Sequence, residues 1–533
     1  MSLGRSRVPS STSLFAAAFL LGSVPAWSAQ VLHRGNGAEP ETLDPQLSTG
    51  VPEAHLQRDL FEGLVAEAAD GKLIPGTAER WEISPDGTVY TFHLRANAKW
   101  SNGDPVTAQD VVYSYRRLLD PKTASKYAFM QWPLKNGEAF SKGENKDPEA
   151  IGIKAVNERT VQATLERPTP YYLGLLAHHA SYIVPRKAIE AHAERWTRPG
   201  NIVSNGAFRL EAWTPQDRIK LVKNPSYHDA RSVQIDEIYY YPTEDQQAEL
   251  KRYRAGELDL TYRIPVDQIA WARQNLPNET RITPFFGTYY YAFNLTKPPF
   301  QDNLKLRQAL SLAIDRETIV EKVMRGGEVP AYGWVPPNTL NYVKFDSATA
   351  ALKQADRDAQ ARKLLAEAGY GPGKPLEVEI LYNTSDEHRR VAIAIAAMWD
   401  EKLGIKAKLV NQEWKVYLDL GAQKQFQIRR AGWIGDYNDA WTFLELLKGD
   451  IGKQNPAGYT SGRYDELLRR SATTLDLNER ARILAEAERI MVEDTPVAPL
   501  FHYVSKAMVK PHVQGWQPNV QDVHPTRWLS VKK

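Results

Sequence analysis

The chain has 533 residues, which is too many for one hydrophobic core, and a prior of about 100–200 residues per domain predicts about three domains or two closely coupled lobes. Its 67 Lys and Arg residues against 64 Asp and Glu residues give a net charge of +3, so nothing calls for a nucleic-acid partner. Hydrophobic residues at 42% and charged residues at 25% are typical of an ordinary globular protein.

The first predicted element is an export signal over residues 1–29. Two arginines precede an apolar run at 14–21, and the small residues Ala26 and Ser28 fit a cleavage site. The run is shorter than the ~20 apolar residues of a membrane span, and no later segment qualifies, so we expect no span. Because the chain contains no Cys, it lacks both disulfides and a lipid-modified cysteine. These features predict a periplasmic protein.

The next predicted elements are short and are separated by turns. A strand begins at Val31, and a turn at 84–87 precedes an alternating strand at 89–94. Thr107 is a good N-cap for a helix that we expect to run to about Leu119.

Residues 376–439 show the clearest pattern. Strands are predicted at 376–381, 405–410 and 426–430, and helices at 386–403 and 414–423. Such a strand-helix-strand-helix-strand segment indicates a parallel α/β unit, in which ligands bind beyond the carboxyl ends of the strands. The run FQIRRAGWIGDYND at 426–439 ends there in a loop with Trp433 and Asp436, and its mixed charges predict a ligand that carries both charges.

Many ordered motifs resemble the periplasmic oligopeptide-binding proteins of ABC importers, solute-binding protein family 5, including its murein-peptide-binding members. The matching runs are FEGL at 61–64, AERW at 78–81, DGTVYTFHLR at 86–95, KWSNG at 99–103, PVTAQDV at 105–111, PGNIVSNGAF at 199–208, TYYY at 288–291, RQALSLAIDR at 307–316, LYNTSD at 381–386 and VNQEW at 410–414. The resemblance covers the mature chain end to end.

The resemblance implies an α/β fold like that of type II periplasmic binding proteins, with two lobes joined by a hinge. It implies three domains, with a hinge near Gly287 and Val504 that lets the lobes close on ligand. The expected domains are I (30–61, 187–288 and 505–533), II (62–186) and III (289–504).

The resemblance assigns the two ends of a bound peptide. Asp436 is expected to bind the peptide α-ammonium, the alternative being a loop-capping role. Ala431, Gly432 and Trp433 are expected to form an edge that holds the peptide as an added strand. The alternative for Gly432, compatible with this, is an unusual backbone angle.

Further residues are expected around the peptide. Trp414, Trp433 and Tyr127 match aromatic residues that line side-chain pockets in the family, with core packing as the alternative. Arg430 and His388 match cations that reach the C-terminal carboxylate, with an ordinary surface cation as the alternative. Arg offers planar donors, while His can serve neutral or charged.

Two positions depart from the family pattern. Thr49 precedes Gly50-Val51 where relatives tend to have an acid, and Gly421 stands where they tend to have an arginine. Thr49 and Val51 are still expected to contact the ligand. Both departures predict a cleft with less charge and a specialised peptide, such as a murein peptide.

Catalysis has little support in the sequence. There is no His-Glu-x-x-His, no Gly-x-Ser-x-Gly and no phosphate loop, and the adjacent His178 and His179 fit no regular metal pair. We therefore expect a monomeric binding protein without a cofactor, a metal or catalytic residues. Its expected partners are a peptide and an inner-membrane ABC transporter of permease and ATPase. The alternatives are a dedicated murein-peptide receptor and, in a different class, a secreted hydrolase.

Overall fold

The computed structural model describes residues 1–4, 29–337, 339–343, 345, 347–474 and 476–532. The export signal expected over residues 1–29 lies, apart from its ends, outside the described residues. Within the described residues, no helix is long and apolar enough to cross a membrane.

The largest sheet has six strands in the order β12-β16-β11-β15-β13-β14. Strands β13, β14 and β15 run parallel to one another, which confirms the predicted α/β unit, and the other neighbours pair antiparallel. The strands are β11 Thr280–Phe293, β12 Val329–Pro330, β13 Glu377–Asn383, β14 Lys406–Gln412, β15 Ile428–Ile434 and β16 Val497–Met508.

The helices of this unit follow their local signals. Helix α11 spans Asp386–Leu403, because the Ser385 hydroxyl accepts a hydrogen bond from the His388 amide and Gly404 ends the helix with a left-handed φ of 68°. Helix α12 spans Trp414–Ala422. Strand β15 runs to Ile434, four residues past its expected end, so Trp433 lies in the strand and not in the following loop. Pairing with β11 produces this extension, which local sequence does not reveal.

Two four-stranded sheets form the rest of the framework. One has the order β1-β10-β9-β8 and the other β4-β5-β7-β6. The predicted turn at 84–87 joins β4 to β5, and Thr107 caps α2 in a reciprocal capping box with Asp110. The strands are β1 Val31–Gly37, β4 Ala78–Ile83, β5 Val89–Leu94, β6 Ile153–Asn157, β7 Thr160–Thr164, β8 Phe208–Thr214, β9 Arg218–Lys223 and β10 Glu237–Pro242.

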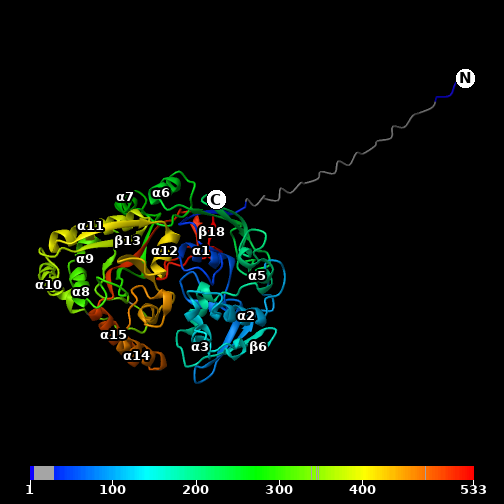
Figure 1. Cartoon of the computed structure of the whole chain (residues 1–533). Coiled ribbons are helices and arrows are strands. Elements are labelled where there is room, and N and C mark those ends of the chain that lie inside the picture. Colours follow the sequence, from blue (N-terminus) through cyan, green and yellow to red (C-terminus); the bar gives the residue numbers. More distant parts are fainter. Residues whose placement is uncertain (5–28, 338, 344, 346, 475, 533) are drawn as a thin grey trace.

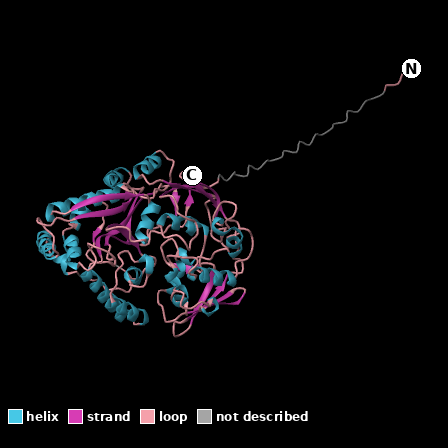
Figure 2. Cartoon of the chain, viewed as in Figure 1, coloured by secondary structure: helices cyan, strands magenta, loops and turns pink. Residues whose placement is uncertain are grey.

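Helices cover the sheets from outside, as Figure 2 shows for the six-stranded sheet. Two strand pairs complete the fold: β2 Val65–Glu67 with β3 Leu73–Pro75, and β17 Val513–Gln514 with β18 Ser530–Val531. The other helices are α1 Val51–Leu60, α2 Ala108–Leu119, α3 Gly137–Ser141, α4 Tyr172–Ala177, α5 Arg186–His192, α6 Gln246–Arg254, α7 Ile269–Asn275, α8 Leu304–Leu312, α9 Arg316–Thr318, α10 Gln354–Glu367, α13 Trp441–Leu444, α14 Gly462–Thr473 and α15 Leu477–Asp494.

The chain forms two groups of elements side by side. In Figure 1, α8, α10, α11, α14 and α15 lie on one side, and α1, α2, α3 and α5 lie on the other. The long strands β11 and β16 pair from Thr280 opposite Met508 to Ala292 opposite Val497, with an interruption between Pro284 and Thr288. The expected hinge positions lie at this interruption, while the domain boundaries remain predictions.

Candidate functional site

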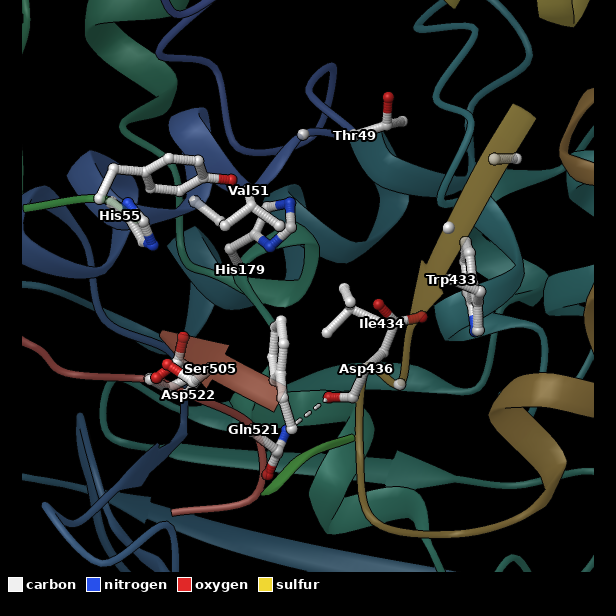
Figure 3. Close-up of a pocket in the computed structure, with 18 of the residues that line it drawn as sticks. Thr49, Val51, His55, His179, Trp433, Ile434, Asp436, Ser505, Gln521 and Asp522 are labelled. Carbon is white, nitrogen blue, oxygen red and sulfur yellow. Dashed lines mark hydrogen bonds between the residues drawn. The ribbon is translucent and has the colours of Figure 1, made fainter. Parts of the chain in front are cut away.

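A cavity of about 250 Å³ lies between the two groups of elements (Figure 3). Its lining includes nine of the ten residues that the sequence suggested: Thr49, Val51, Tyr127, Trp414, Arg430, Ala431, Gly432, Trp433 and Asp436. The tenth, His388, lines an adjoining cavity of about 150 Å³, which Val51, Trp414, Arg430 and Gly432 also border. The structure therefore brings together residues from α1, α11, α12, β15 and the loop after β15.

The carboxylate of Asp436 lies in the loop that follows β15, with its side chain 6% exposed. The hydroxyls of Tyr127 and Thr442 each donate to it at 3.4 Å, and Nε2 of His178 lies 3.1 Å from Oδ1. Among the described residues, no backbone N–H donates to this carboxylate, so the loop-capping alternative is wrong. Gln521 supports the loop by donating to the Asp436 carbonyl at 3.1 Å, the dashed line in Figure 3.

His178 is a neutral donor to Asp436. Its Nδ1 accepts a hydrogen bond from the Ala180 amide at 3.3 Å, so the hydrogen of the neutral ring sits on Nε2, which faces the carboxylate. Burial, and then the charge of Arg58, holds the pKa of His178 well below its ordinary value. No local pattern predicts this role, because His178 is far from Asp436 in the chain.

Burial raises the pKa of Asp436 to about 8, against hydrogen bonds from Tyr127 and Thr442 and the charge of Arg58. In the described part of the chain, no Lys or Arg nitrogen lies within 4 Å of the carboxylate. An acid that is buried among neutral donors gains most from a ligand that brings a positive charge.

Strand β15 has one free edge. It pairs with β11 from Ile428 to Ile434, but it pairs with β13 only at Ile428 and Arg429. The Gly435 amide donates to β11, whereas the Arg430 carbonyl accepts from the Tyr417 hydroxyl on the opposite side. Since successive residues of a strand alternate, the backbone groups of Gly432 and Ile434 also face the free edge.

Gly432 is needed for close packing. A Cβ at this position would overlap the hydroxyl oxygen of Tyr503. The φ of Gly432 is not positive, so the alternative of an unusual backbone angle is wrong. Ile434, which the sequence did not single out, lines both cavities beside Gly432.

Arg430 and His388 differ in charge. The Arg430 guanidinium lies 4.6 Å from the ring centroid of Tyr289 and donates to Asn383 and Tyr503 at 3.0 Å each. Its exposure is 8%, so it is not an ordinary surface cation. Burial, and then the charge of Arg430, lowers the pKa of His388 well below its ordinary value. This shift favours the neutral form of His388, one of the two forms in which an imidazole can serve a carboxylate.

The aromatic residues serve the core and the cavity together. Tyr127 and Trp433 belong to the largest buried cluster and also line the cavity, so core packing and pocket lining both hold for them. The indole Nε1 of Trp433 is buried without a hydrogen-bond partner among the described residues. Trp414 is half-buried and stacks on Tyr417, with ring centroids 5.7 Å apart.

A cation lies beside Gly421. A Cβ on Gly421 would overlap the guanidinium of Arg429, and Arg429 lines the cavity. A cationic side chain from β15 thus lies beside α12 at Gly421, while the expected loss of charge relative to the family stays a prediction. Thr49 lines the same cavity without a charge.

Comparisons with known proteins agree on one family. The profile described as bacterial extracellular solute-binding proteins, family 5, matches residues 72–455. The periplasmic oligopeptide-binding protein OppA of Salmonella typhimurium is 42% identical over 490 residues, which cover 91% of this chain and 90% of the relative.

Solved structures extend this likeness to the fold. The Escherichia coli murein tripeptide binding protein MppA has a TM-score of 0.92 at 38% identity and covers 95% of this chain and 99% of its own. Haemophilus influenzae OppA in complex with the peptide RPPGFSPFR has a TM-score of 0.91 at 38% identity, with the same coverage. An unliganded open form of MppA has a TM-score of only 0.67, at 38% identity, although it covers 94% of this chain and 97% of its own.

Proposed function

Because the chain belongs to the bacterial extracellular solute-binding proteins of family 5, we propose that it is a periplasmic receptor that binds peptides and delivers them to an ABC importer of inner-membrane permease and ATPase. The observation that carries this proposal is the buried carboxylate of Asp436, which has no cationic partner among the described residues and lies at the end of the free edge of β15. A free peptide combines an ammonium with a main chain that can extend that edge.

Each part of the peptide has a partner in the cleft. Asp436 binds the α-ammonium, with Tyr127 and His178 holding the carboxylate in place. The backbone of Gly432 and Ile434 bonds the peptide main chain as an added strand. Arg430 reaches the C-terminal carboxylate, and His388 assists as a neutral donor. The aromatic residues Trp414 and Trp433 border the side-chain pockets.

Two lobes close around this peptide. Domain I takes 30–61, 187–288 and 505–533, domain II takes 62–186, and domain III takes 289–504. The bends lie near Gly287 and Val504, beside the interruption in the β11–β16 pairing. The receptor acts as a monomer, since the residues of the proposed site all come from one chain.

Catalysis is not part of the proposal. The relatives are named binding proteins, and within the described residues no group of three or more His, Asp or Glu stands close enough to hold a metal ion. Incubation with a defined peptide should return it intact. A cleaved peptide would instead support the hydrolase alternative.

The proposal is tested by the ligand that the protein carries from the periplasm. We expect mass spectrometry of material released by denaturing the purified protein to show peptides with free amino termini. A single murein peptide would support the dedicated receptor. Recovery of only non-peptide compounds, together with no calorimetric response to peptides, would contradict the proposal.

A further inference from the structure

The side chain of Arg429, from β15, packs against helix α12. Its guanidinium carbon lies 4.4 Å from the ring centroid of Tyr417, a cation–π contact. On the same helix, Gly421 has no side chain, and a Cβ there would overlap the guanidinium. Glycine at position 421 thus creates the space in which the Arg429 head group lies.

The Arg429 guanidinium has no protein partner in the described part of the chain. No carboxylate lies within 4 Å of it, and none of its N–H groups donates a hydrogen bond, although Nε is buried. Buried donors almost always have partners, and the Nε of Arg429 has none among the described residues, so this cation is suited to an anionic ligand. Since Arg429 lines the main cavity, that ligand lies in the cleft.

The charges around the cavity favour an anionic group. Its lining carries eight Lys and Arg residues but only two acids, Asp436 and Asp522: the cations are Arg34, Arg58, Lys126, Arg263, Arg429, Arg430, Lys453 and Lys506. Two of the eight have carboxylate partners: Lys506 pairs with Glu328 and Glu387, and Arg58 lies 3.8 Å from Glu67.

Arg429 and Arg430 serve different carboxylates. Neighbouring residues of a strand point to opposite faces, and the two guanidiniums contact different aromatic rings, Tyr417 and Tyr289. If Arg430 takes the C-terminal carboxylate, Arg429 remains for a second carboxylate on the same ligand.

We propose that Arg429, which packs against Gly421 and Tyr417, binds a side-chain carboxylate of the peptide, so that the cleft selects acidic peptides. This inference rests on the proposed function and names its ligand class. Planar donors suit Arg429 to a carboxylate, which can accept two parallel hydrogen bonds from it.

The test uses tripeptides of Ala in which one residue is Glu, Gln or Lys at each position in turn. By calorimetry, we expect one position at which Glu binds the wild-type protein about tenfold more tightly than its neutral isostere Gln, with Lys weakest. Arg429→Met should remove the preference for Glu over Gln and leave the all-Ala peptide nearly unchanged. The exposed Arg362→Met on α10 is the matched control and should keep the preference.

Gly421→Ala provides a second variant that keeps the arginine. Because the overlapping atoms are the end of a flexible side chain, the helix should accept Ala without loss of melting temperature, while Arg429 is displaced. We expect this variant to lose most of the preference for Glu as well.

The outcomes are separable. If the preference for Glu survives Arg429→Met, the inference is overturned. It is also overturned if the preference survives Arg429→Met but disappears when the C-terminal carboxylate of the peptide is amidated. If the wild-type protein binds none of the peptides, including all-Ala, the proposed function itself fails.

Discussion

At the scale of the residue, Asp436 is a buried acid that is held by neutral groups. Tyr127, Thr442 and His178 all face its carboxylate, and none carries a charge at neutral pH. Such a site is costly for the protein alone and favourable for an ammonium ligand. We therefore expect that the buried acid required for ligand binding lowers the free energy of unfolding of the peptide-free protein.

Asp436→Asn should stabilise the peptide-free protein at high pH. The pKa of Asp436 is about 8 in the folded state against an ordinary 3.8, so between these values the folded protein keeps a proton that the unfolded chain has lost. Wild-type stability thus falls as the pH rises through this window, whereas the amide is unaffected. Calorimetry should show the variant's melting temperature rising relative to wild type from pH 5 to pH 9.

The exposed Asp419→Asn on α12 is the control for this measurement and should show no such trend. A constant difference between Asp436→Asn and wild type across the pH range would mean that the Asp436 proton is not coupled to folding.

The sequence predicted that Asp436 lies in the cleft, and the structure places it there, but its surroundings could not be predicted. The residue sits in a local motif with Gly432 and Trp433, and that motif is visible in one stretch of chain. The contact of His178 with Asp436 and the packing of Arg429 on Gly421 join segments that are distant in the chain. No local sequence pattern predicts such contacts.

Among the helices and strands, local sequence signals determine the bounds of some elements, and pairing with distant strands determines those of others. Helix α11 has the bounds that the sequence predicts, because its cap residues Ser385 and Gly404 act locally. Strand β15 was predicted too short, because its last residues are extended by pairing with β11. The free edge depends on where β13 stops pairing, which is a property of the sheet alone.

The free edge predicts an alternating response to changes in the peptide backbone. An extended ligand bonds β15 through every second residue, so N-methylation of an amide that faces the edge removes a hydrogen bond and adds a clash. We expect such peptides to lose at least about 1 kcal/mol of binding free energy, and those methylated at outward amides to lose little.

Titration calorimetry of a singly N-methylated tetrapeptide series measures this pattern. The unmethylated peptide with one D-residue serves as a control for general loss of shape. Equal losses at every position would show that the peptide is not held as an added strand.

At the scale of the whole molecule, the two groups of elements are in contact across the cleft. The rings of Tyr171 and Tyr437 stack 5.3 Å apart, and Lys142 lies 3.3 Å from Asp450. The fold agrees more closely with one structure of MppA than with its unliganded open form, at the same sequence identity. These features favour a closed arrangement that opens by a hinge.

A peptide bound between the lobes should shift the protein from the open to the closed arrangement, and so compact and stabilise it. Ligand at a hundred times its dissociation constant adds about 2.7 kcal/mol to the free energy of unfolding. Small-angle scattering should show a smaller radius of gyration with peptide, and Tyr437→Ala, which removes the stacking contact, should reduce the compaction. Unchanged scattering at proven saturation would count against the hinge.

The most direct test of the account is a thermodynamic cycle between Asp436 and the peptide amino terminus. Calorimetry would compare a peptide and its N-acetylated form on the wild-type protein and on Asp436→Asn. For the free peptide we expect the substitution to cost about 3–5 kcal/mol, because the buried ammonium loses its partner. Acetylation should cost the wild-type protein a similar amount and the variant much less. If the two changes are instead additive, Asp436 does not bind the α-ammonium.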